Sequence, residues 1–366
     1  MTPRERFLTV LRGGNADRVP LLLQGFCRAR IEDAKEPAER EILERIIQQT
    51  HFFVNCPSHI NRWLITPPQR IARTQEKHAD GNVLTISRID TPKGELTAIE
   101  AHKPTTRTVW TVKYPVESLG DIGKIRSVPW QLPRDLEPPD PARLPRDFAA
   151  RGVLRTTISS PFVCVAGLMP YQYFLELCAT ELGLMKELSA LCLERTMAVL
   201  DVLLSRSGIE YVWMGGCEWL TPPMASARVY EELVQRFERP IIERVHAAGA
   251  LCHVHCHGRV RSTLESVIAR GADFFEPVEP PPDGDITFAE AKAIAGGRIT
   301  LGGNIEARLL TYGSLSEVEA AARAAFEGGK ARMVLMDSVG PIAQLSPTQV
   351  RNYHRVIEVW EELAPM

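Results

Sequence analysis

Histidines alternate with other residues in one short segment, Cys252-His253-Val254-His255-Cys256-His257-Gly258. On a β-strand successive side chains point to opposite faces, so His253, His255 and His257 would share one face. Neutral imidazole is a common zinc ligand, and imidazole also serves acid–base chemistry near neutral pH. We expect His255 and His257 to form part of a functional site. We expect His253 to be a hydrogen-bonded core residue one pleat deeper.

A thiol and a carboxylate follow the preceding apolar run, at Cys217 and Glu218. Neighbouring parallel strands end side by side, so Glu218 should face His255 and His257 as a metal ligand or as a group that orients one. Cys217 lies at the same level and is a candidate soft ligand or substrate contact. The structural alternatives are that Glu218 caps the following helix and that Cys217 is a small buried residue.

Polar residues also end three later apolar runs. Glu276 and Glu279 end one run, Asn304 follows two glycines at the end of the next, and Asp337 ends the last. Each residue alone indicates little, but barrel enzymes assemble their sites from the ends of several strands. We predict catalytic roles for Glu218, His257 and Asp337, substrate contacts from Asn304, Glu276 and Cys217, and a metal held by His255, His257 and Glu218.

The elements that would position these residues are eight short apolar runs. They span residues 19–26, 51–56, 153–158, 211–217, 251–257, 273–278, 299–304 and 333–337. From the third run onward, helical patterns lie between most of them, at residues 172–206, 226–248, 262–270, 287–294 and 316–327, and residues 352–362 close the chain. This alternation predicts an α/β fold, a (β/α)8 TIM barrel formed by residues 1–366 as one domain. A doubly wound sheet is the structural alternative.

The long segment between the second and third runs has a different pattern. Residues 82–90 and 95–101 alternate polar and apolar side chains around Pro92-Lys93-Gly94, and residues 106–112 follow. The pattern predicts a β-hairpin with a third strand, inserted at about residues 80–115 between barrel strands 2 and 3. This insertion is either a lid over the site or a decoration of the barrel.

The composition excludes several classes of protein. Lys and Arg number 43 and Asp and Glu 45, a net charge of −2, which removes the electrostatic basis for binding nucleic acid or an anionic membrane. No apolar stretch reaches the ~18 residues of a transmembrane helix, and the amino terminus is not a signal peptide. Eight scattered cysteines in a chain of this size indicate reduced thiols and a cytoplasmic protein.

Several motifs together resemble the uroporphyrinogen decarboxylase superfamily, which includes the zinc-dependent corrinoid methyltransferases. The motifs are Thr2-Pro3-Arg4-Glu5-Arg6, Asp17-Arg18-Val19-Pro20, Val245-His246-Ala247-Ala248-Gly249, His255-Cys256-His257-Gly258, Gly302-Gly303-Asn304-Ile305, and the tail from Leu345-Ser346-Pro347 to Asn352-Tyr353. The resemblance covers most of the chain and implies a (β/α)8 barrel that is often a homodimer.

The resemblance is closer to the methyltransferase branch. The decarboxylases carry Arg-Gln-Ala-Gly-Arg after the first strand to hold substrate carboxylates, whereas here residues 24–30 offer only Arg28 and Arg30. The methyltransferases bind zinc through His-x-Cys-Gly and a later Cys. Here His255 and His257 occupy the first two positions and no cysteine follows Cys256, so Glu218 or Asp337 would supply the third ligand.

The resemblance therefore implies a methyltransferase that moves a methyl group between a small methylated compound and a corrinoid carrier, with zinc assistance and a corrinoid protein as partner. Glycines at strand ends, at Gly215, Gly216, Gly302 and Gly303, are expected to leave room for the planar corrinoid. The alternatives are a metal-free carboxy-lyase like the decarboxylases and a non-catalytic ligand-binding barrel.

Overall fold

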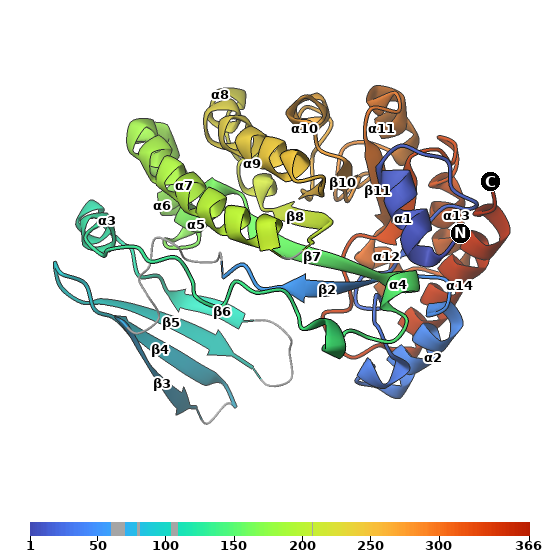
Figure 1. Ribbon diagram of the computed structural model, residues 1–366, viewed down its shortest axis with the longest axis horizontal. Helices are drawn as coiled ribbons and strands as arrows, with labels where there is room; N and C mark the ends of the chain where they lie inside the picture. The colour runs from blue at the N-terminus through green and yellow to red at the C-terminus, as the bar shows by residue number, and fades with distance from the viewer. Residues whose placement is uncertain (60–69, 79–80, 104–108, 207) are drawn as a thin grey trace.

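The main body of the protein is a parallel eight-stranded sheet. The computed structural model describes all residues except 60–69, 79–80, 104–108 and 207 (Figure 1). The strand order is β1-β12-β11-β10-β9-β8-β7-β2, and each neighbouring pair is parallel. The strands are β1 (Leu21–Leu22), β2 (Phe52–Cys56), β7 (Gly152–Ser159), β8 (Tyr211–Gly215), β9 (Leu251–His255), β10 (Phe274–Glu276), β11 (Thr300–Ile305) and β12 (Met333–Asp337). All eight predicted strands are confirmed, several of them shorter than predicted.

The strands curl around a shared interior. Alternate residues of seven strands or their flanks meet there in one apolar cluster, the interior cluster, which includes Leu22, Phe53, Val153, Tyr211, Trp213, Leu251, Phe274, Val334 and Met336. The intervening residues, such as Val212 and Val254, pack outward against the helices in a second and larger cluster, the outer core. Among the described residues no β pairing joins β1 to β2. The expected closed barrel is therefore a curled sheet with a seam between its first two strands.

Helix α1 (Pro3–Leu11) covers the amino end of the interior. A capping box starts it, because Thr2 Oγ1 accepts the amide of Glu5 and the Glu5 carboxylate accepts the amide of Thr2. Phe7 projects from α1 into the interior, stacks on His51 with ring centroids 3.8 Å apart, and contacts the rings of Phe53, Tyr211 and Phe274. Phe7 thus closes the amino end of the interior.

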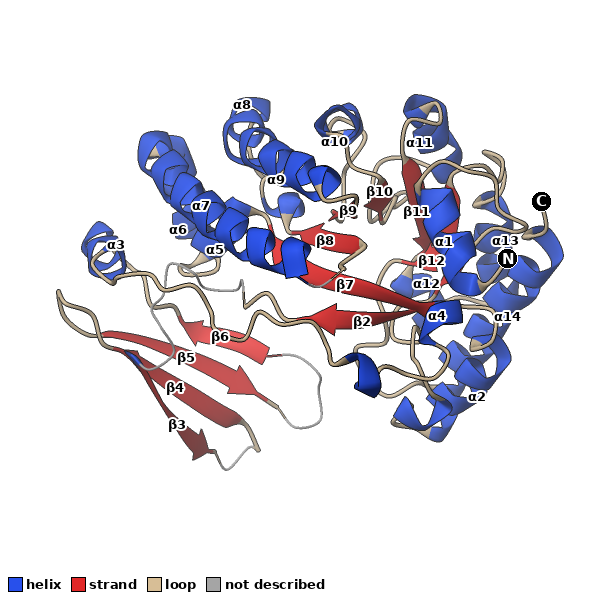
Figure 2. Cartoon of the chain, viewed as in Figure 1, coloured by secondary structure: helices blue, strands red, loops and turns tan. Residues whose placement is uncertain are grey.

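Helices surround the sheet on its outer side (Figure 2). They are α2 (Pro37–Ile46), α3 (Leu119–Arg126), α4 (Phe148–Arg151), α5 (Pro161–Ala166), α6 (Tyr171–Thr180), α7 (Leu182–Arg206), α8 (Ala227–Tyr230), α9 (Arg236–Ala247), α10 (Leu264–Arg270), α11 (Phe288–Ala295), α12 (Ala307–Tyr312), α13 (Leu315–Ala324) and α14 (Pro347–Leu363). A π-helical turn, Glu231–Gln235, joins α8 to α9. No helix in the described part of the chain is both long and apolar enough to cross a membrane.

A separate antiparallel sheet lies between β2 and β7 in the chain. Its four strands are β3 (Ile71–Lys77), β4 (Val83–Ile89), β5 (Leu96–His102) and β6 (Val109–Lys113), in that order. The expected hairpin corresponds to β4 and β5, and β6 falls at the expected third strand, of which residues 106–108 lie outside the described residues. The sequence did not predict β3, which precedes the expected insertion. Ile89 and Leu96 belong to the outer core, so this sheet packs onto the main body.

Candidate functional site

One buried carboxylate holds two of the three histidines. Glu276 ends β10 beside His255 on β9, and its Oε1 lies 2.8 Å from His255 Nδ1 and 2.8 Å from His253 Nε2. His253 lies one pleat deeper, where its Nδ1 pairs with the hydroxyl of Tyr211. Tyr211, His253, Glu276 and His255 therefore form a chain of polar groups that runs from the interior cluster to the carboxyl end of the strands.

Within this row of polar groups, the pKa values of His253 and His255 shift in opposite directions. Burial lowers the pKa of His253, despite the carboxylate beside it. Burial would also lower the pKa of His255, but the charge and hydrogen bond of Glu276, together with the charge of Glu218, raise it to about 9. Burial opposes ionisation of Glu276 too, yet the two histidines hold its pKa well below the usual range. His255 and Glu276 are thus a buried imidazolium–carboxylate pair at neutral pH.

His257 lies just beyond the end of β9. Its Nδ1 is 3.2 Å from Glu279 Oε1, and the other oxygen of Glu279 accepts the amide of Gly258 at 2.7 Å. The rings of His255 and His257 meet edge to face with centroids 4.7 Å apart. The expectation that these two histidines adjoin is met, although β9 ends before His257. We call the region around His255, His257, Glu276 and Glu279 the mouth.

Glu218 approaches the mouth from the end of β8. It lies in a 3-10 turn, Cys217–Trp219, that follows the left-handed Gly216. Burial raises the pKa of Glu218, opposed by hydrogen bonds from backbone amides and by the charges of His255 and His257. Its Oε2 atom is buried and has no hydrogen-bond partner among the described residues. The charges of His255 and His257 thus act on Glu218, and the expected convergence of the three side chains stays a prediction.

The predicted ligand set of His255, His257 and Glu218 stays a prediction. In the described part of the chain, these three residues do not bring ligand atoms within 4.8 Å of one another, whereas Cys217, Glu218 and Cys256 do. Glu276 and Glu279 face the Nδ1 atoms of His255 and His257, as the outer partners of metal-ligating histidines often do, and this leaves the Nε2 atoms for other ligands.

Two other predicted site residues point away from the mouth. Cys217 is buried in the outer core next to Cys256, because β8 ends at Gly215 and the turn at Gly216 redirects the chain. Asp337 also faces outward, where its carboxylate accepts the amide of Gln24 at 2.7 Å and the hydroxyl of Tyr353 at 3.1 Å. Burial raises the pKa of Asp337 to about 8. Its contacts are those of a structural residue that ties β12 to α14.

Asn304 occupies the interior side of β11. It is 6% exposed, and neither its amide nitrogen nor its amide oxygen has a hydrogen-bond partner among the described residues. A buried amide without partners costs about 1–3 kcal/mol relative to a satisfied one. Asn304 therefore has hydrogen-bonding capacity that the described residues do not use, and its role as a substrate contact stays a prediction.

The glycines at strand ends do not provide open space. A Cβ at Gly215 would lie 2.2 Å from the ring of Trp213, and one at Gly216 would lie 2.4 Å from Val163. A Cβ at Gly302 would meet Met336 Sδ at 2.5 Å and Glu276 Cβ at 2.6 Å, and one at Gly303 would meet Phe288 at 2.3 Å. The chain's own side chains fill the space next to these four glycines, and room for a planar corrinoid at the mouth stays a prediction.

The sequence reading missed several residues of the interior. Trp213 lies beside His255 with ring centroids 5.1 Å apart. Arg155, on β7, donates to Asn55 Oδ1 at 2.8 Å and lies over the ring of Phe53. Two features of the sequence could have indicated them: an arginine, Arg155, inside an apolar run, and an aromatic residue, Trp213, two positions after Tyr211.

Glu306, which follows β11, also has a shifted pKa. Burial and the neighbouring Asp283 raise the pKa of Glu306 to about 7.

The two arginines considered for carboxylate binding are engaged elsewhere. Arg28 donates to the backbone oxygens of Gly25 and Asp33 and pairs with Glu39. Arg30 is largely exposed and pairs with Asp33. The loop after β1 therefore holds itself together and directs neither cation to a polyacid.

Comparisons with known proteins agree with this architecture. The chain aligns with a solved methyltransferase from Methanosarcina mazei over 99% of both chains, with a TM-score of 0.61 and 15% sequence identity, which is similarity of fold. A B12-independent methionine synthase from Shewanella sp. W3-18-1 aligns with 80% of this chain and 76% of its own, with a TM-score of 0.41 and 12% identity. No curated protein matches the sequence.

The uroporphyrinogen decarboxylase (URO-D) family model matches residues 145–360, more than half of the chain. This match, on a parallel curled sheet whose carboxyl end carries the polar site, shows that the chain belongs to the URO-D family.

Proposed function

We propose that this chain is a cytoplasmic methyltransferase that moves a methyl group between a small methylated compound and a corrinoid carrier. The observation that carries the proposal is the His255–Glu276 pair, with 2.8 Å between Nδ1 and the carboxylate, at the end of the strands where barrel enzymes place their chemistry. Nε2 of His255 makes no hydrogen bond within the described part of the chain, so it is available to a reacting atom.

His255 acts as a general acid in this proposal. The bond between the methyl carbon and its oxygen or sulfur breaks, and the electron pair stays on that heteroatom. His255 Nε2 donates a proton to it, so a neutral alcohol or thiol leaves, while the methyl carbon bonds to an electron pair of the acceptor. Glu276 keeps its hydrogen bond to Nδ1 and orients the ring throughout. When bound, a reduced corrinoid supplies the accepting electron pair.

The proposal gives no step to zinc, and the ligand set of His255, His257 and Glu218 stays a prediction. The corrinoid acceptor rests on the family resemblance and not on the glycines of the mouth, whose neighbouring space is filled by side chains. A corrinoid protein would be the partner that delivers this acceptor.

The charges of the mouth favour a substrate without carboxylates. Glu218, Glu276 and Glu279 gather there, while Arg28 and Arg30 are engaged in their own loop. Several carboxylates on a substrate would be repelled by like charges in this partly buried setting. Asn304 offers an unsatisfied amide to a small polar compound. These features favour methyl transfer over decarboxylation of a polyacid.

Substitution of the proposed acid tests this function. Enzyme, reduced corrinoid and methylated ethers, thiols or amines are mixed, and cobalt absorbance reports methylation. His255→Gln should lower kcat by roughly 10²–10⁴-fold, the usual contribution of a general acid, with little change in KM. The matched control is His246→Gln, because His246 also pairs with a carboxylate, Asp273 at 2.8 Å, but lies on the outer side of the sheet.

The control variant should retain the wild-type rate. Equal losses in both variants would show a structural effect and contradict the role of His255. If no methylated compound reacts and a tetrapyrrole acid is decarboxylated, the protein is a carboxy-lyase. If neither reaction occurs while a ligand binds, the non-catalytic barrel is correct.

A further inference from the structure

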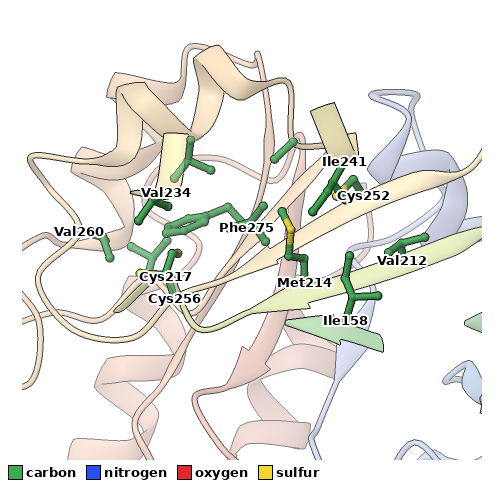
Figure 3. Close-up of a cluster of buried hydrophobic side chains, with 14 of the residues drawn as sticks. Ile158, Val212, Met214, Cys217, Val234, Ile241, Cys252, Cys256, Val260 and Phe275 are labelled. Atoms are coloured by element: carbon green, nitrogen blue, oxygen red, sulfur yellow. The ribbon is translucent and has the colours of Figure 1, made fainter. Parts of the chain in front are cut away.

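Two thiols and a carboxylate converge behind the mouth. The ligand atoms of Cys217, Glu218 and Cys256 lie within 4.8 Å of one another. Figure 3 shows Cys217 and Cys256 together near Val260 and Val234, whereas Cys252, on the same face of β9, lies apart from them near Ile241. The three donors come from the ends of the neighbouring strands β8 and β9. The cluster is therefore a product of the fold and not of one local sequence motif.

The turn after β8 brings these donors together. Gly216 has a φ of 109°, in the left-handed region, and a Cβ there would strike Val163 at 2.4 Å. The following 3-10 turn directs the Cys217 thiol to the backbone oxygen of His255 at 3.7 Å. It leaves Glu218 between this thiol pair and the histidines, to which its charge is coupled.

The two thiols make only the weak hydrogen bonds that sulfur forms. Cys217 and Cys256 are each 1% exposed and hydrogen-bond each other. Cys217 Sγ lies 3.7 Å from the backbone oxygen of His255, Cys256 Sγ lies 3.7 Å from that of His257, and Thr221 Oγ1 lies 3.5 Å from Cys256 Sγ. Glu218 Oε2 is buried and has no partner in the described part of the chain. Three ligand atoms are thus close together with only weak competing interactions.

We infer that Cys217, Glu218 and Cys256 bind a thiophilic divalent cation such as Zn²⁺. Sulfur and carboxylate oxygen are both zinc ligands, and the two sulfurs select against hard cations such as Mg²⁺ and Ca²⁺. Three protein ligands leave a fourth position open.

This site differs from the histidine set that the sequence predicted. The cation would lie on the outer side of β9 and share Glu218 with the mouth. His255 and His257 keep their carboxylate partners and remain outside the coordination sphere. The inference does not depend on methyl transfer, because cation binding is measured without turnover.

Cobalt(II) is the probe, because thiolate ligands give it a charge-transfer absorption band in the near ultraviolet. The full-length protein is stripped with a chelator, kept reduced with a phosphine, and titrated with Co²⁺ alone. One ion per chain should bind with this band. Cys217→Ser or Cys256→Ser should remove about half of the band per bound ion or abolish binding, and the double variant should remove it entirely.

Two variants serve as controls, and circular dichroism checks that each protein is folded. Cys252→Ser changes a buried cysteine of β9 outside the cluster, so the band should be unchanged. His257→Ala should also retain the band. Loss of the band in His257→Ala, its persistence in the Cys217/Cys256 double variant, or the absence of any thiolate band in the folded wild-type protein would overturn the inference.

Discussion

At the residue scale, Asn304 and Asn352 present a matched contrast. Both are buried, but Asn352 donates to the backbone oxygens of Leu310 and Gly313 at 3.0 and 2.9 Å, whereas Asn304 has no partner among the described residues. A buried amide inside a protein network serves stability, and one left unsatisfied inside a site is available to a ligand. The two asparagines should therefore respond differently to the same substitution.

We predict that Asn304→Leu raises KM for the methylated substrate while leaving the free energy of unfolding unchanged or higher. Removing an unsatisfied buried amide relieves its desolvation cost. Asn352→Leu should instead lower the free energy of unfolding by about 1–3 kcal/mol, because it leaves buried backbone oxygens unpaired, and should not change KM. Urea unfolding and steady-state kinetics of both variants measure these effects. A KM unaffected by Asn304→Leu would remove this residue from the site.

Asp337 gives a prediction about pH. Burial raises its pKa to about 8 in the folded chain, although the amide of Gln24 and the hydroxyl of Tyr353 oppose this rise, and the charge of Glu276 adds to it. The ordinary value is 3.8, so between these limits the folded state holds a proton that the unfolded state releases. The contribution of Asp337 to stability is therefore present below about pH 4 and is lost as the pH rises toward about 8.

Asp337→Asn should flatten this dependence, because the amide has no proton to lose. Urea unfolding of both proteins, at intervals between about pH 5 and 8, measures the slope of the unfolding free energy. The wild-type protein should lose stability relative to the variant as the pH rises. Parallel slopes would show that Asp337 is ionised in the fold.

At the scale of elements, β11 supports the mouth through a glycine. Gly302 lies against Glu276 Cβ and Met336 Sδ, at distances that leave no room for a methyl group. Overpacking of this kind usually costs about 1–3 kcal/mol. Since Glu276 holds His255, a displaced Glu276 would also disturb the proposed acid.

We expect Gly302→Ala to lower both the free energy of unfolding and kcat. The control is Gly183→Ala in α7, where a Cβ meets nothing within 4 Å and a helical alanine should stabilise by about 0.5–1 kcal/mol. Thermal unfolding and turnover of the two variants distinguish them. Wild-type kcat in Gly302→Ala would mean that β11 does not position Glu276.

The elements also show which features could be read from the sequence. Apolar runs bounded by turns indicated all eight strands, since strands covered by helices bury both faces. The same property hides which face points inward. In β12 every residue is buried, so the sequence could not show that Met336 faces the interior and Asp337 the helices. In β9 the polar histidines mark the interior face, and the expected proximity of His255 and His257 is found.

Other features of the site depend on contacts that no local pattern encodes. The side chain of Cys217 does not lie on the predicted face, because β8 ends at Gly215 and the backbone turns at Gly216. The space next to the mouth glycines is filled by Trp213, Met336 and Phe288, which come from other positions in the chain. Glu276 is the partner of His255. This pairing could be identified only from the register between β9 and β10, which the structure supplies.

At the scale of the whole molecule, the interior is closed by apolar packing at one end and lined by polar groups at the other. Helix α1 seals the amino end with Phe7, and the polar chain from Tyr211 to His255 rises to the carboxyl end. The mouth gathers carboxylates although the net charge of the chain is only −2. This distribution of charge agrees with the proposal of a small substrate that carries no negative charge.

One measurement tests the central claim most directly, namely NMR detection of the labelled methyl group. The full-length protein is incubated with reduced corrinoid and a ¹³C-methyl ether or thioether, and the products are compared with those of His255→Gln. The account predicts that the label moves to the corrinoid in equal amount to the alcohol or thiol released, and that the variant slows this transfer roughly 10²–10⁴-fold. A label that stays on its heteroatom with every donor tested, or one that moves equally fast in His255→Gln, would contradict it.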